Sequence, residues 1–104
     1  MFARLTSLNF QPGKAEEAKR IYNEEIVSVV KSQKGNVGVW LLEPTNERDE
    51  YISLTEWISK ADADAYESSG TYRTLVDKLK DMYASKPVLK TYNIAETKVM
   101  AGSM

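Results

Sequence analysis

Histidine and cysteine are both missing from this chain of 104 residues. Without cysteine, the chain has no disulfide framework, no thiolate nucleophile and no Cys-ligated zinc or iron–sulfur site. Without histidine, Ser-His-Asp hydrolysis, histidine-ligated haem and the usual histidine zinc sites are excluded as well. Any acid–base or binding chemistry therefore depends on Tyr, Lys, Arg, Asp, Glu and the amide of Asn.

An excess of charge of one sign is also missing. The chain has 14 Lys and Arg against 15 Asp and Glu, for a net charge of −1. A nucleic-acid binder needs a clustered cationic footprint, and a membrane-surface protein needs a polybasic patch, so neither class is expected. No apolar run approaches the length of a membrane span, and the first ten residues lack the pattern of a signal peptide. We therefore expect a cytoplasmic protein that uses neither membrane nor nucleic acid.

The residues that are present alternate between strand and helix patterns. The length suits one domain, and a 42% share of hydrophobic residues suits an ordinary core. Period-two patterns predict strands over 2–10, 37–43, 51–58 and 88–95. Apolar spacings of three and four predict a helix over 14–33 and another that begins after a Ser59 cap, is punctuated at Ser69-Gly70 and ends at Ser85-Lys86-Pro87. Residues 1–95 form the expected domain, and 96–104 a flexible or partner-contacting tail.

The order strand, helix, strand, strand, helix, strand predicts an α+β fold. It is the ferredoxin-like split βαβ arrangement, a four-stranded antiparallel sheet with both helices on one face. The strands nevertheless carry large apolar residues on both faces, for example Trp40 and Leu42 opposite Val39 and Leu41. A monomer would leave an apolar sheet face in water, which soluble proteins rarely tolerate. We therefore predict a homodimer that packs sheet against sheet.

Four short segments, in this order along residues 2–95, resemble the antibiotic biosynthesis monooxygenase family. They are Pro12-Gly13-Lys14, Gly35-Asn36-Val37-Gly38, Glu56-Trp57-Ile58-Ser59-Lys60-Ala61 and Ser69-Gly70-Thr71-Tyr72-Arg73-Thr74-Leu75. The resemblance implies a dimeric α+β barrel. Members of this family include cofactor-free quinol or anthrone oxygenases, haem-degrading enzymes, signal-molecule isomerases and proteins of no known activity.

The chain departs from the family at the positions that haem degraders use. The resemblance puts their axial histidine at Val76, their haem-distorting tryptophan at Tyr66 and their strand-one asparagine at Thr6. Many other members carry a histidine at the Tyr66 position. Haem degradation by the histidine-ligated route is therefore not expected, nor is a histidine base.

Cofactor-free oxygenation remains compatible with the residues present. It needs an apolar pocket, removal of one proton and donors for the resulting oxyanion. For each candidate residue, packing in the core or exposure to solvent competes with a role in the site. The two interpretations are most evenly balanced at Arg4, because it shares a strand face with apolar residues. The catalytic candidates are Trp57, Tyr66 and Arg73, and the substrate-binding candidates are Arg4, Thr6, Tyr51 and Tyr72.

The sequence leaves three functions open. The first is a monooxygenase that needs no cofactor or metal and oxidises a small electron-rich aromatic of the quinol or anthrone type. The second is a non-catalytic dimeric barrel that binds a small hydrophobic metabolite, or a stress-response protein without activity. The third, ranked last, is an isomerase or aldol-type enzyme for a phosphorylated sugar-like signal. No phosphate cradle supports this third function, because the glycines at 35 and 38 open a strand rather than a helix.

Overall fold

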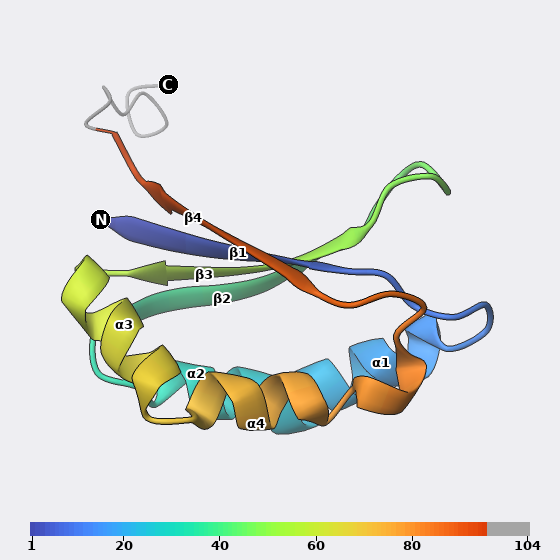
Figure 1. Ribbon diagram of the computed structural model, residues 1–104, viewed down its shortest axis with the longest axis horizontal. Coiled ribbons are helices and arrows are strands. Elements are labelled where there is room, and N and C mark those ends of the chain that lie inside the picture. Colours follow the sequence, from blue (N-terminus) through green and yellow to red (C-terminus); the bar gives the residue numbers. More distant parts are fainter. Residues whose placement is uncertain (96–104) are drawn as a thin grey trace, which may run out of the picture.

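The computed structural model describes residues 1–95, and these form a four-stranded sheet with one layer of helices (Figure 1). The predicted tail over 96–104 lies outside the described residues. In chain order the strands and helical segments are β1 (Phe2–Leu8), α1 (Ala15–Ile21), η1 (Tyr22–Ile26), α2 (Val27–Lys31), β2 (Asn36–Leu42), β3 (Tyr51–Trp57), α3 (Lys60–Ser68), α4 (Thr71–Asp77), η2 (Lys80–Met82) and β4 (Val88–Asn93).

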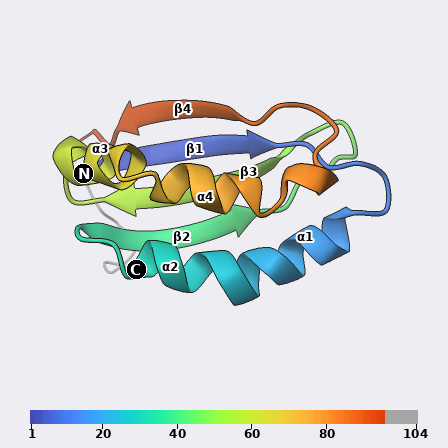
Figure 2. The same cartoon turned by 60° about the horizontal axis from the view of Figure 1, so that its bottom comes forward.

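The sheet has the strand order β2-β3-β1-β4, and its neighbouring strands are antiparallel. Figure 2 shows the helices lying across one face of this sheet, with α1 and α2 alongside β2. The predicted ferredoxin-like α+β fold is confirmed. Because β1 and β3 are adjacent in the middle of the sheet, their helix-facing side chains form the floor beneath the helical layer.

The first helix is interrupted by a π-helical segment that the sequence did not predict. The pattern predicted one helix over 14–33, but the wider π turn of η1 occupies Tyr22–Ile26 between α1 and α2. Such insertions into an α-helix are rare and occur frequently at functional sites. Both end residues of η1, Tyr22 and Ile26, are buried against the sheet.

The second helical region starts and breaks where the sequence predicted. The Ser59 hydroxyl accepts a hydrogen bond from the Asp62 backbone N–H at 3.2 Å, which caps the start of α3. Gly70 then takes the left-handed conformation with φ 88°, which glycine adopts without a steric cost, and α4 begins at the next residue. No helix in the described part of the chain is both long and apolar enough to cross a membrane.

The hydrophobic core lies between the sheet and the helices. Trp57 is completely buried there, among Phe2, Ile26 and Leu79. Burial of large apolar side chains is the main stabilising term for a domain of this size.

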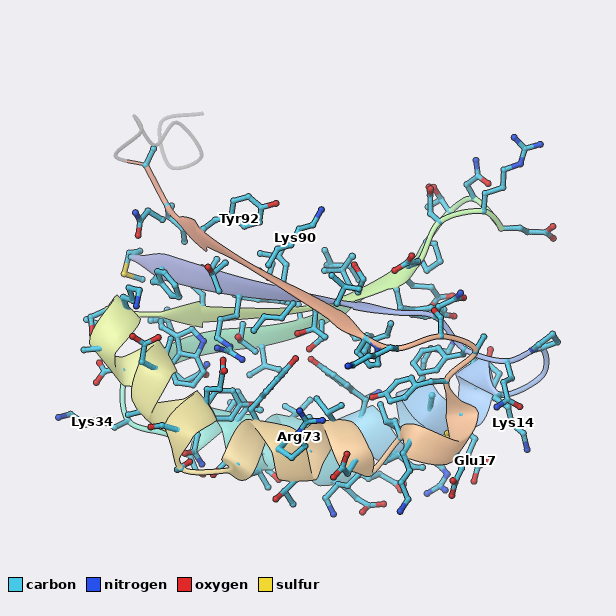
Figure 3. The ribbon with its side chains drawn as sticks, viewed as in Figure 1. Lys14, Glu17, Lys34, Arg73, Lys90 and Tyr92 are labelled. Atoms are coloured by element: carbon cyan, nitrogen blue, oxygen red, sulfur yellow. The ribbon has the colours of Figure 1, made fainter. Side chains whose placement is uncertain are left out.

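The opposite face of the sheet remains uncovered. Its exposed apolar side chains include Trp40, which is 46% exposed, with Leu42, Val88 and Tyr92. Tyr92 and Lys90 rise from β4 on the side away from the helices (Figure 3). An irregularity between Asn36 and Gly38 interrupts the two-residue period of β2 and leaves Val37 exposed, although an unbroken period would put it on the same face as Val39. The predicted homodimer stays a prediction, and so does a cytoplasmic location.

Candidate functional site

Four polar side chains form a patch on the helix-facing side of the two central strands. Arg4 is paired with Thr55 and Thr6 with Ser53 in the register of β1 and β3. Cross-strand neighbours are about 5 Å apart and alternate residues along a strand about 7 Å apart, so the four side chains form a compact rectangle. Polar groups under a helical layer need partners, and each of these four has one in the described part of the chain.

The helices supply two tyrosine hydroxyls to this floor. The Tyr72 hydroxyl, from α4, lies 3.2 Å from the Thr6 hydroxyl. The Tyr22 hydroxyl, from η1, lies 2.7 Å from the Ser53 hydroxyl and also donates to the Trp40 carbonyl at 3.3 Å. The π turn is therefore the element that directs a hydroxyl onto β3.

Trp57 forms a third hydrogen bond to the polar patch and stacks on a tyrosine of the site. Its indole N–H donates to the Thr55 hydroxyl at 2.9 Å, and its ring stacks on Tyr66 with centroids 4.9 Å apart. Tyr66 in turn meets Tyr72 edge to face at 6.0 Å. Trp57, Tyr66 and Tyr72 thus form a continuous aromatic series along one side of the floor.

Arg4 is a buried cation that is only partly paired. It is 3% exposed, and its Nη1 donates to the Glu67 carboxylate at 2.6 Å. Its guanidinium carbon lies 4.5 Å from the ring centroid of Tyr72 and 5.5 Å from that of Tyr66, which places the cation within reach of both π faces. The other terminal nitrogen, Nη2, is buried and has no hydrogen-bond partner among residues 1–95.

These groups line one side of a cleft between the sheet and the helices. The cavity within the cleft has a volume of about 40 Å³, and the cleft opens to solvent. Among the residues described, Arg4 is the one charged side chain in its lining. The lining consists of Arg4, Thr6, Leu8, Tyr22, Ile26, Val30, Ser53, Thr55, Tyr66, Tyr72, Leu75, Val76, Leu79 and Tyr83. Such a mainly apolar pocket with a few convergent polar groups is typical of small-molecule sites.

Burial keeps three tyrosines of the cleft, Tyr22, Tyr66 and Tyr83, protonated. It raises the pKa of Tyr66 well above its ordinary value, although the nearby Arg4 charge acts in the opposite direction. Burial also raises the pKa of Tyr83, whose hydroxyl donates to the Val76 carbonyl at 2.9 Å. The pKa of Tyr22 is raised for the same reason and lowered in part by its bond with Ser53. At neutral pH these groups act as hydrogen-bond donors and not as bases.

The structure brings most of the predicted site residues together. Arg4, Thr6, Tyr66 and Tyr72 all line the cleft. Trp57 lies behind Tyr66 as its stacking partner and does not line the cleft itself.

Two candidates lie elsewhere. Tyr51 packs edge to face on Phe10, with ring centroids 5.2 Å apart, at the other end of β3 from Trp57. Arg73 is exposed on α4, one residue beyond Tyr72 (Figure 3), and is not among the cleft residues. One residue along a helix turns the side chain by about 100°, which explains why Tyr72 and Arg73 diverge.

Sequence reasoning missed Tyr22, Tyr83 and Glu67 as site residues. Tyr22 falls in the apolar stripe of the predicted first helix, where a tyrosine of the site and a residue of the core give the same pattern. The sequence does indicate Ser53, because it shares a strand face with Thr55 and Trp57. The contact of Glu67 with Arg4 joins residues 63 positions apart, and no local pattern encodes it.

Comparison with known proteins gives one family and many similar folds. Residues 1–78 match the family described as antibiotic biosynthesis monooxygenase. Among curated proteins, none matches the sequence.

Three solved structures illustrate the similarity of fold. A Nitrosomonas europaea protein that carries the same family name is 17% identical, with a TM-score of 0.77 over 92% of this chain and 100% of its own. A Deinococcus radiodurans protein of that name is 12% identical, with a TM-score of 0.80 over 95% of this chain and 97% of its own. The haem degrader MhuD of Mycobacterium tuberculosis, solved with two haems in its active site, is 15% identical, with a TM-score of 0.78 over 95% and 100%. At these identities the likeness concerns the fold alone.

Proposed function

Because this chain belongs to the antibiotic biosynthesis monooxygenase family, we propose that it oxidises a small electron-rich aromatic with dioxygen and without a resident cofactor. The substrate class is a quinol or an anthrone, and the site is the cleft between the sheet and the helices. The observation that carries the proposal is the buried Arg4 cation in a cleft that is otherwise lined by uncharged, mainly aromatic and aliphatic side chains.

No protein atom forms a covalent bond with the substrate in the proposed reaction. An anthrone-type substrate loses one proton to water at the mouth of the cleft, and the resulting anion gives one electron to dioxygen. The radical pair combines to form a carbon–oxygen bond, and the peroxide takes a proton back. Loss of one water molecule then breaks the O–O bond and the remaining C–H bond, leaving a new carbonyl. One substrate and one dioxygen thus give one ketone and one water.

The residues of the cleft have distinct roles in this proposal. The positive charge of Arg4 stabilises the anionic form of the substrate, because a cation in a site with little water acts at low dielectric. The hydroxyls of Tyr66 and Tyr72 are available as donors to a substrate oxygen. Trp57 is a positioning residue, because it acts through its stacking on Tyr66. Arg73 and Tyr51 have no role in the proposed site.

Histidine-ligated haem does not fit this cleft. Val76, at the position where the resemblance places the axial histidine, lines the cleft with an aliphatic side chain that has no ligand atom. The chain has no histidine elsewhere to replace it. We derive no step through a haem group.

We also propose that a second copy of the chain covers the outer face of the sheet. Trp40, Leu42, Val88 and Tyr92 give this face a group of exposed apolar side chains. The loop between β2 and β3 rises on the same side of the sheet (Figure 1). Burial of exposed apolar surface is the usual driving force for association under twofold symmetry.

Oxygen uptake by purified, metal-free protein tests the proposed function. A panel of hydroquinones, naphthoquinols and anthrones is compared with buffer, because these compounds autoxidise, and the product mass is checked for one added oxygen. We expect uptake above the background rate for at least one compound, a reduced rate for Tyr72→Phe, and an unchanged rate for Arg20→Met on the exposed face of α1.

Uptake equal to the buffer rate across the panel would contradict catalysis. It would leave the alternative, a barrel that binds a small hydrophobic metabolite without converting it. The substituted family positions Thr6, Tyr66 and Val76, all in the cleft lining, are the observation in favour of that alternative.

A further inference from the structure

The unpartnered nitrogen of Arg4 indicates what kind of ligand the cleft takes. A guanidinium carries five N–H donors in a fixed planar fork that matches two acceptor oxygens. One carboxylate oxygen of Glu67 accepts a hydrogen bond from Nη1 of Arg4. The second terminal nitrogen is buried without a hydrogen-bond partner in the described part of the chain. A charged donor left in this state destabilises the empty protein, so a ligand oxygen that pairs with it gains correspondingly in affinity.

We propose that the natural ligand of the cleft is an aromatic anion, whose acidic oxygen pairs with Arg4 and whose ring lies against the tyrosines. The acidic oxygen belongs either to a carboxylate on the ring or to a hydroxyl acidic enough to be ionised at neutral pH. This inference rests on the proposed function for its choice of cleft, and it narrows the substrate class from neutral quinols to ionised ones.

The charges around Arg4 support an anion and not a second cation. The groups facing it are the Glu67 carboxylate and the two rings of Tyr66 and Tyr72. Glu67 is 52% exposed, so water screens its charge, whereas Arg4 is almost completely buried. The cation therefore dominates the potential inside the cleft.

The rest of the lining suits the ring of such a ligand. Tyr66 and Tyr72 present an edge-to-face pair, and Leu75, Val76 and Leu79 add aliphatic surface from the same helical region. Aromatic rings pack favourably in this setting, by burial and by offset or edge-to-face contact. A ligand with a single acidic group on a flat ring therefore has the complementary charge and shape for a mainly apolar cleft with one cation.

Binding of ligands that cannot be oxidised tests this inference separately from turnover. The probes are naphthoate, a dinitronaphthol whose hydroxyl is ionised at neutral pH, and the neutral isostere naphthamide, each titrated by calorimetry. We expect at least one anion to bind about tenfold or more tightly than naphthamide, the ratio that one additional charged hydrogen bond supplies. The anion that shows the preference identifies a carboxylate or a phenolate as the natural group. Equal affinity of all three probes, or no binding by any, would overturn the inference even if the protein oxidises a neutral quinol.

Two substitutions, Arg4→Met and Glu67→Gln, test whether Arg4 causes the preference for the anion. Arg4→Met is expected to abolish this preference, while the control variant Arg20→Met, on the exposed face of α1, keeps it. Glu67→Gln is expected to increase the preference several-fold, because it removes the competing carboxylate. This second variant changes an exposed side chain and remains informative if Arg4→Met does not fold. A preference that survives in Arg4→Met, or that does not rise in Glu67→Gln, contradicts the assignment.

Discussion

The guanidinium of Arg4 lies over the ring of Tyr72, with 4.5 Å between its central carbon and the ring centroid. The same tyrosine places its hydroxyl 3.2 Å from Thr6, two residues along β1 from Arg4. Tyr72 therefore holds both a cation and a hydroxyl of the same strand. This double contact fixes the first turn of α4 relative to the sheet, within the candidate site.

Substitution of Tyr72 should separate these two contacts. Tyr72→Phe keeps the ring under Arg4 and loses the bond to Thr6, at a cost of about 1 kcal/mol in the free energy of unfolding. Tyr72→Leu loses both and should cost at least about 1 kcal/mol more. Urea denaturation measures the difference in free energy of unfolding between the two variants. Equal stability of the Phe and Leu variants would show that the cation–π contact contributes nothing.

A double-mutant cycle tests the pair of Trp57 and Thr55. Thr55→Val leaves the buried indole N–H unpaired and should destabilise the protein by about 1–3 kcal/mol. Trp57→Phe removes that donor together with packing volume and should cost at least as much. In the double variant no donor is left unpaired, so its loss in free energy of unfolding should fall short of the sum by about 1 kcal/mol. Strict additivity would mean that the 2.9 Å contact is energetically silent.

The pH profile of turnover should report the substrate and not the protein. The chain has no histidine or cysteine, and burial raises the pKa of Tyr22, Tyr66 and Tyr83. These three tyrosines are then not expected to titrate between about pH 5 and 8. The rate should rise with pH as the substrate ionises, and the midpoint should shift when a more acidic substrate replaces it. A midpoint common to all substrates would indicate a titrating protein group instead.

The raised tyrosine pKa values also predict a loss of stability in alkali. An unfolded tyrosine loses its proton near pH 10, whereas folded Tyr66 keeps its proton to higher pH. Above pH 10 the unfolded state therefore binds fewer protons, and the free energy of unfolding falls as the pH rises. The contribution is complete below pH 10 and decreases by about 1.4 kcal/mol per pH unit for one such group, until the pH reaches the folded pKa.

Denaturation at several alkaline pH values measures this slope. Tyr66→Phe should flatten this slope, because it removes a buried tyrosine whose pKa is raised. A slope that is the same in Tyr66→Phe as in the parent protein would contradict the pKa shift.

The proposed homodimer makes its own prediction. Trp40→Glu places a charge on the exposed apolar face, at the edge strand β2, and should convert the dimer to a monomer in analytical ultracentrifugation, without unfolding it. Lys14→Glu, in the turn before α1 and away from that face (Figure 3), serves as the control and should remain dimeric. A parent protein that sediments as a monomer would overturn the proposal directly.

The sequence predicted the fold well because the strand and helix periods are local. The Ser59 cap, the break at Gly70 and the starts of the strands all depend on neighbouring residues, and they occur where expected. The exposed Val37 was not foreseen, because a β-bulge shifts the two-residue period at one point.

The site was predicted less completely, for a physical reason. Arg4, Thr6, Tyr66 and Tyr72 were found because strand faces and family resemblance both indicate them. Which partner a polar group takes across the sheet–helix interface depends on packing between distant segments. The pair of Arg4 and Glu67 is of this kind, and so is the bond from Tyr22 to Ser53.

The π turn at Tyr22–Ile26 has a consequence for chain length. A π turn accommodates one residue more than an α turn does, so it acts as a single-residue insertion tolerated inside a helix. Deleting one residue at Glu24 should restore α-helical spacing and leave α1 in nearly the same orientation relative to α2, because the wider turn takes up the additional residue. Tyr22 would then stay over Ser53. The additional residue is thus confined to the turn itself, so relatives that lack it are expected to keep the same helix orientation.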